Sequence, residues 1–321
     1  MKKVFITGAT GFLGRHLLLE LRKTNYEVTA LCRRIPESDQ QISGIRYCAG
    51  DIEDFMSLSD VMPGAEVVIH AAALVSVRPD DDHRMYQVNV LGTRNVVNAC
   101  LTFGVKKLIH ISSVAALGGS NKNQILDERA GWNGVNAGYG YTKYLSELEV
   151  FRGHSEGLEV SIVNPSVILG PGEANRTSGM ILQFIRKGWP IALDGSANVV
   201  DARDVSKAIV HLMNASISGE RFILNGFSMP WSNLFARISK RLGGRSSYWI
   251  VPTRVAIGVL WLYEMFMKIA YQSPTVTAQA VRMATSGNSY SSDKVIKHLD
   301  FQFHSPESTL DWACSDAEKR V

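Results

Sequence analysis

Length, composition and charge place this chain among ordinary folded globular proteins. Its 321 residues are 45% hydrophobic and 20% charged, and they include no low-complexity tract or internal repeat. Such a chain can form one large domain, or a nucleotide-binding domain with a smaller second one. The 34 basic and 30 acidic residues give a formal charge of +4. This charge is too small and too scattered for a nucleic-acid-binding role.

Cysteine usage and the first residues favour a cytoplasmic location. The chain has no Cys-x-x-Cys motif and no histidine cluster, so we predict reduced thiols and no metal site. The four cysteines lie far apart, at Cys32, Cys48, Cys100 and Cys314. Lys2 and Lys3 precede an apolar run, as in a secretory signal, but glycines interrupt that run too early.

The most informative stretch runs from Val4 to Gly14, with the sequence VFITGATGFLG. A short apolar strand leads into three glycines, and leucines at helical spacing follow. Glycines let the backbone approach a ligand, and unpaired N–H groups at the start of a helix attract a pyrophosphate. This order predicts a dinucleotide site. Its expected contacts are Gly8, Thr10, Gly11, Phe12 and Leu13.

The second predicted strand, Tyr26–Cys32, is followed by Arg33 and Arg34. NAD-binding proteins usually carry an acidic residue at this place, where it binds the ribose 2′-hydroxyl. An arginine favours a 2′-phosphate instead. Arg33 therefore predicts NADP(H) as the cofactor, with NAD(H) as the alternative. The competing interpretation is that both arginines are solvated surface residues without a role in cofactor binding.

A third predicted strand, from Ile45 to Gly50, is followed by Asp51 and Ile52. A carboxylate at the carboxyl end of a strand can accept a hydrogen bond from an adenine amino group. We therefore expect both residues to contact the cofactor. Asp51 could instead cap the following turn.

The next apolar run ends in small residues against which a cofactor can lie, at Ala71, Ala72 and Ala73. His70 lies inside this run without a partner in the sequence, so we do not predict a catalytic role for it. A helix is predicted to begin at Asn89. Its side chain would tie neighbouring strand ends together beside the cofactor.

Alternating strand and helix patterns predict an α/β fold, with a doubly wound parallel sheet and helices on both faces. The strand Lys107–Ile111 would place Ile111 beside the cofactor and bring Ser112 and Ser113 to the sheet edge where ligands bind. Tyr139 and Lys143 are four residues apart on a predicted helix and share one face.

The glycine motif, the strand-end serine and Tyr-x-x-x-Lys, in this order, resemble the extended short-chain dehydrogenase/reductase family, within the NAD-dependent epimerase/dehydratase superfamily. The resemblance covers essentially the whole chain. It implies that Tyr139 is the proton donor or base. Ser113, five residues before Gly118, would bind the same substrate oxygen, with Ser112 as the alternative. Lys143 would bind the nicotinamide ribose and lower the pKa of Tyr139.

The resemblance also implies a Rossmann-type domain over residues 1–165, which carries the catalytic residues, and a smaller substrate lobe over 166–321. Segments 199–212 and 221–226 would return to the core. We also expect a homodimer. The chain that enters the substrate lobe would pass beside the nicotinamide, with contacts from Pro165 and Val167.

The lobe's sequence favours a small apolar substrate. Relatives that process nucleotide sugars place an arginine near segment 195–201, where it pairs with the diphosphate, and this segment has none. Arg176 or Arg186 could substitute. Segments 164–172 and 197–205 look more like those of the dihydroflavonol-reductase and 3β-hydroxysteroid-dehydrogenase group.

We therefore predict an oxidoreductase that transfers a hydride between nicotinamide and a carbonyl or secondary alcohol. A nucleotide-sugar epimerase or dehydratase is the first alternative. A non-catalytic NADP-sensing regulator is the second.

Segment 255–271 is not explained by these motifs. Its uninterrupted apolar part covers nine residues, whereas a transmembrane helix needs about 20. Glu264 and Lys268 would also be costly in lipid, so we reject a transmembrane span. Besides core packing, a substrate pocket, a subunit interface and peripheral contact with a membrane surface remain. We favour a pocket lined by Trp261 and Phe266.

Overall fold

The structure is a computed structural model that describes residues 1–119, 125–134, 138–172, 177–269, 277–285 and 288–315. Its centre is a seven-stranded sheet with the order β3-β2-β1-β4-β5-β7-β11, in which all neighbours are parallel. The strands are β1 (Lys2–Thr7), β2 (Tyr26–Cys32), β3 (Ile45–Ala49), β4 (Val67–His70), β5 (Lys107–Ile111), β7 (Glu159–Pro165) and β11 (Glu220–Leu224). The predicted doubly wound fold is confirmed.

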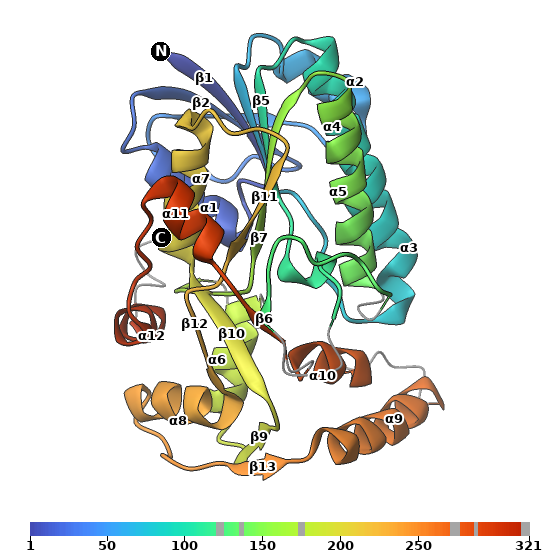
Figure 1. Ribbon diagram of the computed structural model, residues 1–321, viewed down its shortest axis with the longest axis vertical. Helices are drawn as coiled ribbons and strands as arrows, with labels where there is room; N and C mark the ends of the chain where they lie inside the picture. Colours follow the sequence, from blue (N-terminus) through green and yellow to red (C-terminus); the bar gives the residue numbers. More distant parts are fainter. Residues whose placement is uncertain (120–124, 135–137, 173–176, 270–276, 286–287, 316–321) are drawn as a thin grey trace.

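Helices cover both faces of this sheet (Figure 1). One face carries α1 (Phe12–Leu21), α7 (Ala202–Asn214) and α11 (Asp293–Leu299). The other face carries α2 (Phe55–Val61), α4 (Gly92–Thr102) and α5 (Tyr139–Ser155). In α1, Leu17, Leu18 and Leu21 are buried against the sheet, because their helical spacing places them on one side.

The segment before α4 differs from its prediction. The chain is helical well before Asn89, through α3 (Asp82–Met85) and the π-helical turn η3 (Tyr86–Leu91). An acidic residue, Asp82, occupies the first turn of α3 and favours a helix start there, and Met85 provides an earlier buried contact. The short 3₁₀ turns are η1 (Ser38–Gln40), η2 (Pro79–Asp81) and η4 (Val114–Ala116).

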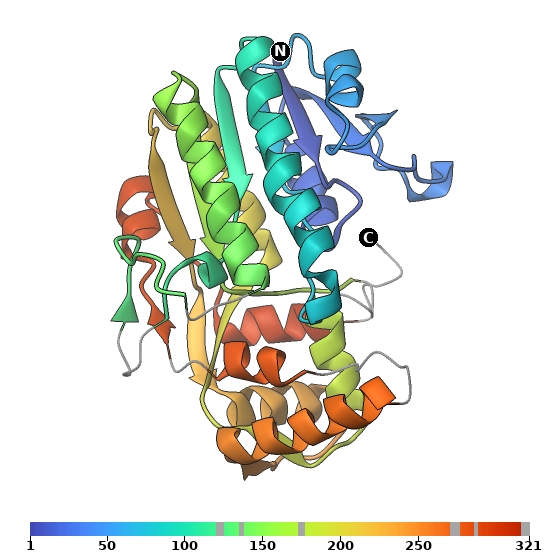
Figure 2. The same cartoon turned by 90° about the vertical axis from the view of Figure 1, so that its right-hand side faces the viewer.

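A smaller lobe lies beyond the carboxyl ends of the large sheet (Figure 2). Its strands are β8 (Val167–Leu169), β10 (Ser196–Asp201) and β12 (Phe227–Pro230) in one sheet, and β9 (Ile191–Leu193) with β13 (Trp249–Val251) in another. Its helices are α6 (Thr177–Arg186), α8 (Trp231–Arg241), α9 (Thr253–Ile269), α10 (Ala278–Ala284) and α12 (Pro306–Cys314). A short pair joins β6 (Ile125–Leu126) to β14 (Ser289–Tyr290).

The two segments expected to return to the core hold most of α7 and most of β11. Helix α7 packs on α1, and β11 pairs with β7 at the edge of the large sheet. The chain thus crosses between the two parts several times, so the smaller lobe is held against the sheet by its own connections.

His70 links β1, β4 and α4 through buried hydrogen bonds. Thr7 Oγ1 accepts from Ala72 N at 3.2 Å and donates to His70 Nδ1 at 2.7 Å. His70 Nε2 donates to Thr93 Oγ1 at 2.9 Å, because the Thr93 hydroxyl donates to Asn89 O. Burial lowers the pKa of His70 to about 3, so the ring is neutral. This arrangement gives His70 a structural role, and the absence of a catalytic role stays a prediction.

Thr7→Val should lower the free energy of unfolding by about 1 to 3 kcal/mol, because Ala72 N–H and His70 Nδ1 lose their buried partner. Urea denaturation would measure the change. Ser59→Ala is the control, since it removes a half-buried hydroxyl bonded to Phe55 O one turn back and should change stability by less than about 0.5 kcal/mol. Equal effects of the two substitutions would contradict the structural role of the network.

Candidate functional site

The glycine motif forms a tight turn between β1 and α1 that can hold a pyrophosphate. Gly8 has a φ of +72°, and a Cβ atom there would lie 2.5 Å from Ala72 N. A Cβ atom at Gly14 would lie 2.8 Å from Ala9 Cα. Gly11 N donates to Gly8 O at 3.0 Å, and Gly11 gives α1 no side-chain cap. The first N–H groups of α1 therefore stay open to an anion, which fits a dinucleotide.

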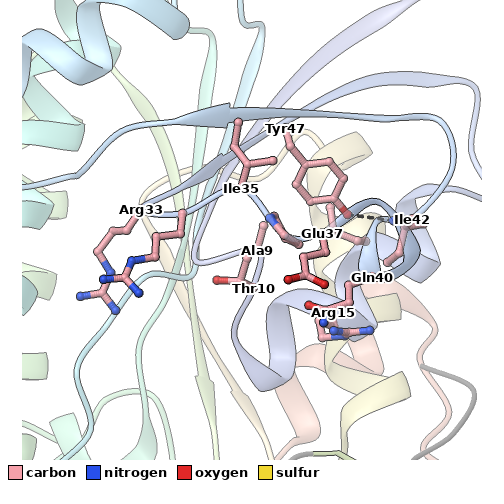
Figure 3. Close-up of a pocket in the computed structure, with 12 residues that line it drawn as sticks. Ala9, Thr10, Arg15, Arg33, Ile35, Glu37, Gln40, Ile42 and Tyr47 are labelled. Atoms are coloured by element: carbon pink, nitrogen blue, oxygen red, sulfur yellow. Dashed lines mark hydrogen bonds between the residues drawn. The ribbon is translucent and has the colours of Figure 1, made fainter.

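A cavity of about 750 Å³ opens beside this turn, over the carboxyl ends of β1, β2 and β3 (Figure 3). Arg33 and Arg34 line it from the end of β2, and Arg15 lines it from α1. In the described part of the chain, neither Arg33 nor Arg34 has a carboxylate partner within salt-bridge distance. Three arginines thus line a cavity whose volume is in the range of small-molecule sites.

Several residues of this cavity were not predicted from the sequence. The segment after Arg34 contributes Ile35, Pro36, Glu37, Gln40 and Ile42, and β3 contributes Tyr47. Tyr47 is opposite Ala30 in the parallel register of β2 and β3, and its hydroxyl accepts from Ile42 N at 3.0 Å. Only this register reveals that Tyr47 faces the cavity, so no local signal identified it. Glu37 adds a carboxylate to the same space.

Asp51 and Ile52 follow β3 at the same sheet edge. Asp51 Oδ1 accepts from Glu53 N at 3.1 Å, which is the turn-capping role considered as its alternative. Ile52 is buried. It packs so closely on Gly92 that a side chain at Gly92 would touch it. Contact of either residue with adenine stays a prediction.

Asn89 connects the segment after β4 to α5. Its side chain accepts from Leu74 N at 2.7 Å and donates to Leu74 O at 2.9 Å. It also donates to Thr142 Oγ1 at 3.0 Å. Asn89 therefore positions the backbone that follows Ala71, Ala72 and Ala73, next to Lys143.

Ser113 and Tyr139 come together at the carboxyl end of β5. Their side chains are hydrogen-bonded, and this bond offsets part of the effect of burial, which raises the pKa of Tyr139 to about 12. Tyr139 is the first residue of α5 and follows Gly138, whose φ is +64°. Ser112 instead lies buried behind the site, beside Glu147. This geometry favours Ser113 over Ser112 as the serine that faces Tyr139.

Lys143 is buried and turned toward the sheet. Its Nζ donates to Ile111 O at 2.7 Å. Burial lowers the pKa of Lys143 to about 8, and the charge of Glu147 opposes this effect. The predicted lowering of the Tyr139 pKa by Lys143 is not found. The reason is that desolvation dominates at Tyr139, while the ammonium is bonded to a backbone carbonyl.

A buried polar network behind Lys143 was missed by sequence reasoning. Glu147 accepts from Asn164 Nδ2 at 2.6 Å and lies 3.3 Å from an Arg221 guanidinium nitrogen. Asn164 Nδ2 also donates to Ser113 O at 3.0 Å. Glu147 could have been noticed, because it follows Lys143 by one helical turn. Arg221 gives no such signal, since only the β7–β11 pairing brings it near.

The remaining predicted residues are Pro165, Val167, Arg176 and Arg186. Pro165 ends β7 and is buried, and Val167 begins β8 and is half-buried. Arg176 lies outside the described residues. Arg186 is exposed at the end of α6 in the smaller lobe and is close enough to Cys314 of α12 to affect its pKa.

In this parallel sheet, the order in which successive strands are added reverses between β1 and β4. A glycine turn and a Ser-Tyr-Lys group lie at the carboxyl edge of the sheet. Together these features define a dinucleotide-dependent enzyme. The family model described as the NAD dependent epimerase/dehydratase family matches residues 4–224. The chain belongs to this family, within the extended short-chain dehydrogenase/reductase group.

Individual relatives agree with this assignment. The chain is 30% identical to a putative dihydroflavonol 4-reductase of a Synechocystis species, over 98% of this chain and 92% of that protein. It is 29% identical to sterol demethylase protein B of Methylococcus capsulatus, over 92% of each chain. Among solved structures, gox2253 shares 26% identity with a TM-score of 0.84, over 99% of this chain and 98% of the other. The protein is an enzyme of the extended short-chain dehydrogenase/reductase type.

Lys143→Met should remove a rise in stability that begins near pH 8. The folded protein releases the Lys143 proton at a pKa of about 8, whereas the unfolded chain keeps it up to the ordinary value of 10.5. Between these values the unfolded state binds more protons, so stability increases with pH, by up to about 1.4 kcal/mol per pH unit.

Urea denaturation of the wild type and of Lys143→Met across this range would measure the difference. Subtracting the variant's free energy of unfolding from that of the wild type at each pH cancels the contribution of the other titrating groups. Parallel pH dependences of the two proteins would contradict the buried ammonium.

Proposed function

We propose that this enzyme transfers a hydride between nicotinamide and a carbonyl or secondary alcohol of a small apolar substrate. The observation that carries the proposal is the hydrogen-bonded Ser113–Tyr139 pair with Lys143 one helical turn further along α5. These groups lie at the edge of a parallel sheet where open α/β folds bind ligands.

Each residue has a distinct task in this proposal. The hydroxyl of Tyr139 gives its proton to the substrate oxygen during reduction and takes it back during oxidation. Ser113 donates a hydrogen bond to the same oxygen. Lys143 binds the nicotinamide ribose, and the glycine turn holds the pyrophosphate. The nicotinamide supplies or accepts the hydride when it is bound.

The pKa values support the direction of reduction. Because burial raises the pKa of Tyr139 to about 12, the hydroxyl is protonated at neutral pH and ready to act as a donor.

An apolar substrate fits the lobe better than a nucleotide sugar. The segment 195–201 carries no arginine, and its Asn198 is already bonded to Ser228 Oγ and Asn288 O. Arg186 lies near Cys314 instead. The names of the two relatives, a dihydroflavonol reductase and a sterol demethylase protein, also point to apolar ketones and alcohols.

Tyr139→Phe should reduce turnover by about 10²- to 10⁴-fold, because it removes the general acid and keeps the ring. The measurement is oxidation of NADPH or NADH with a panel of ketones and aldehydes. Tyr141→Phe, two residues further along α5 and exposed, is the matched control and should keep full activity. A Tyr139→Phe enzyme with more than half of the wild-type rate would contradict the assignment. Turnover of nucleotide sugars alone would favour the epimerase alternative.

We also propose that the enzyme prefers NADP(H). Arg15, Arg33 and Arg34 line the cavity at the adenosine end, where a 2′-phosphate would lie. Glu37 shares this cavity, and its carboxylate disfavours a second anion while it could accept from a ribose hydroxyl. The three guanidinium groups outnumber it, so NAD(H) is the weaker ligand in this proposal.

Arg33→Ala should weaken NADPH binding by roughly ten- to hundredfold, the value of one hydrogen bond to a charged group, and should leave NADH binding nearly unchanged. Fluorescence titration with both reduced cofactors would measure this. Arg94→Ala removes an exposed arginine of α4 and serves as the control. If NADH binds the wild type as tightly as NADPH does, the arginines are merely solvated.

Finally, we propose a homodimer. Helix α5 exposes Tyr141 and Leu148, and apolar side chains on the outer face of a helix favour contact with a partner.

A further inference from the structure

Helix α9 exposes the side that a helix of a globular protein normally buries. Val255, Val259, Leu262 and Phe266 form one stripe along it, and all four are more than half exposed, from 54% to 66%. Trp261, 59% exposed, lies beside this stripe. The pocket interpretation of segment 255–271 is therefore wrong for Trp261 and Phe266. Their side chains project into solvent instead of lining a cavity.

The opposite stripe of α9 faces the protein and carries its acidic residue. Glu264 is half-buried, and its carboxylate accepts from Ala278 N at the start of α10 at 2.6 Å. Ile257, Leu260 and Tyr263 are also half-buried, so α9 is apolar on its outer side as well as on the side that faces the protein, unlike an ordinary surface helix. Figures 1 and 2 show α9 at the end of the molecule opposite the N-terminus, at the margin of the smaller lobe.

The neighbouring β-ribbon continues this apolar surface. Trp249 of β13 is 76% exposed, and Ile250 beside it is 59% exposed. Trp249 N donates to Pro190 O at 2.7 Å, which places the exposed Trp189 next to it. We call α9, β13 and residues 189–191 the apolar end. Tryptophan suits the boundary between water and lipid, because its ring is apolar and its N–H is polar.

Charge around the apolar end is mainly positive, although the exposed Asp194 lies beside β13. Residues 231–269 contain six basic residues and one acidic residue, Glu264. Arg237 and Arg241 are paired with carboxylates of α12. Within the described ranges, the exposed Lys240, Arg245 and Arg254 have no carboxylate partner. A second copy of this chain would bring the same excess of positive charge to the contact, whereas an anionic surface would complement it.

We propose that the apolar end docks on an anionic lipid bilayer, with α9 lying in the interface. None of the helices in the described ranges is long and apolar enough to span a bilayer. An apolar stripe flanked by basic residues is instead the pattern of helices that lie on a membrane surface. Electrostatic attraction to anionic lipids adds to the burial of the apolar side chains.

The docked surface is close to the proposed active site through α10. Glu264 holds the start of α10, and a Cβ atom at Gly138, next to Tyr139, would lie 2.5 Å from Gln279 Nε2 of α10. If the proposed function holds, an apolar substrate dissolved in the bilayer would reach the enzyme at the lobe that touches the membrane. The docking itself does not depend on that function.

Co-sedimentation with vesicles tests the proposal. The full-length protein should bind vesicles of phosphatidylcholine with phosphatidylglycerol more tightly than vesicles of phosphatidylcholine alone. Trp261→Gln combined with Phe266→Gln should weaken binding to both by about tenfold or more, since it removes apolar surface from the contact. Arg245→Gln combined with Arg254→Gln should weaken binding only to the anionic vesicles, by about fivefold per residue.

Met56→Gln combined with Ile296→Gln removes two exposed apolar side chains elsewhere and should leave vesicle binding unchanged. Urea denaturation would verify that each variant is folded. A wild type that stays in the supernatant would overturn the proposal, and so would equal binding to both vesicle types. Self-association in sedimentation velocity that Trp261→Gln with Phe266→Gln abolishes, without vesicle binding, would identify the apolar end as a contact between copies. None of these outcomes depends on turnover, so the docking and the proposed reaction are tested separately.

Discussion

The buried ammonium of Lys143 is the charge on which the arrangement of the site depends. It is held by Ile111 O at the end of β5 and faces Glu147 one turn along α5. Glu147 in turn lies between Lys143 and Arg221, so two cationic side chains share one carboxylate. A buried ion is costly without partners, and this sequence of opposite charges reduces the cost. It also fixes α5 relative to β5, β7 and β11.

The groups on the sheet side of Lys143 are neutral. Burial and the charge of Lys143 both hold the pKa of His110 well below its ordinary range, and the same two causes lower the pKa of His70. The two imidazole rings lie 5.2 Å apart. With both rings neutral, the charge on this side of the site is that of the Lys143 ammonium, which is bonded to Ile111 O at the end of β5. A positive charge at this place suits a reaction in which an oxygen gains negative charge.

Local patterns were enough to predict the parts of the site that are close in sequence. Strands Tyr26–Cys32 and Lys107–Ile111 were predicted with the bounds that the structure has, because apolar residues and strand ends are visible locally. The cavity residue Tyr47 and the partner Arg221 were missed. Tyr47 depends on the register of β2 against β3, and Arg221 on β11 lying beside β7. Neither pairing leaves a mark in the sequence near these residues.

Helix α9 shows the limit of periodicity in another way. An apolar stripe with helical spacing predicts that one side of a helix leaves water, but it does not say what covers that side. The pocket interpretation assumed that the rest of the chain covers it. The hydrogen bond of Glu264 contradicts this assumption. Its carboxylate accepts from the N–H of Ala278, so the side of α9 that carries Glu264 faces α10. The apolar stripe must then face outward, so whatever covers it is outside the described chain, and the unpaired cations around it favour a surface of negative charge.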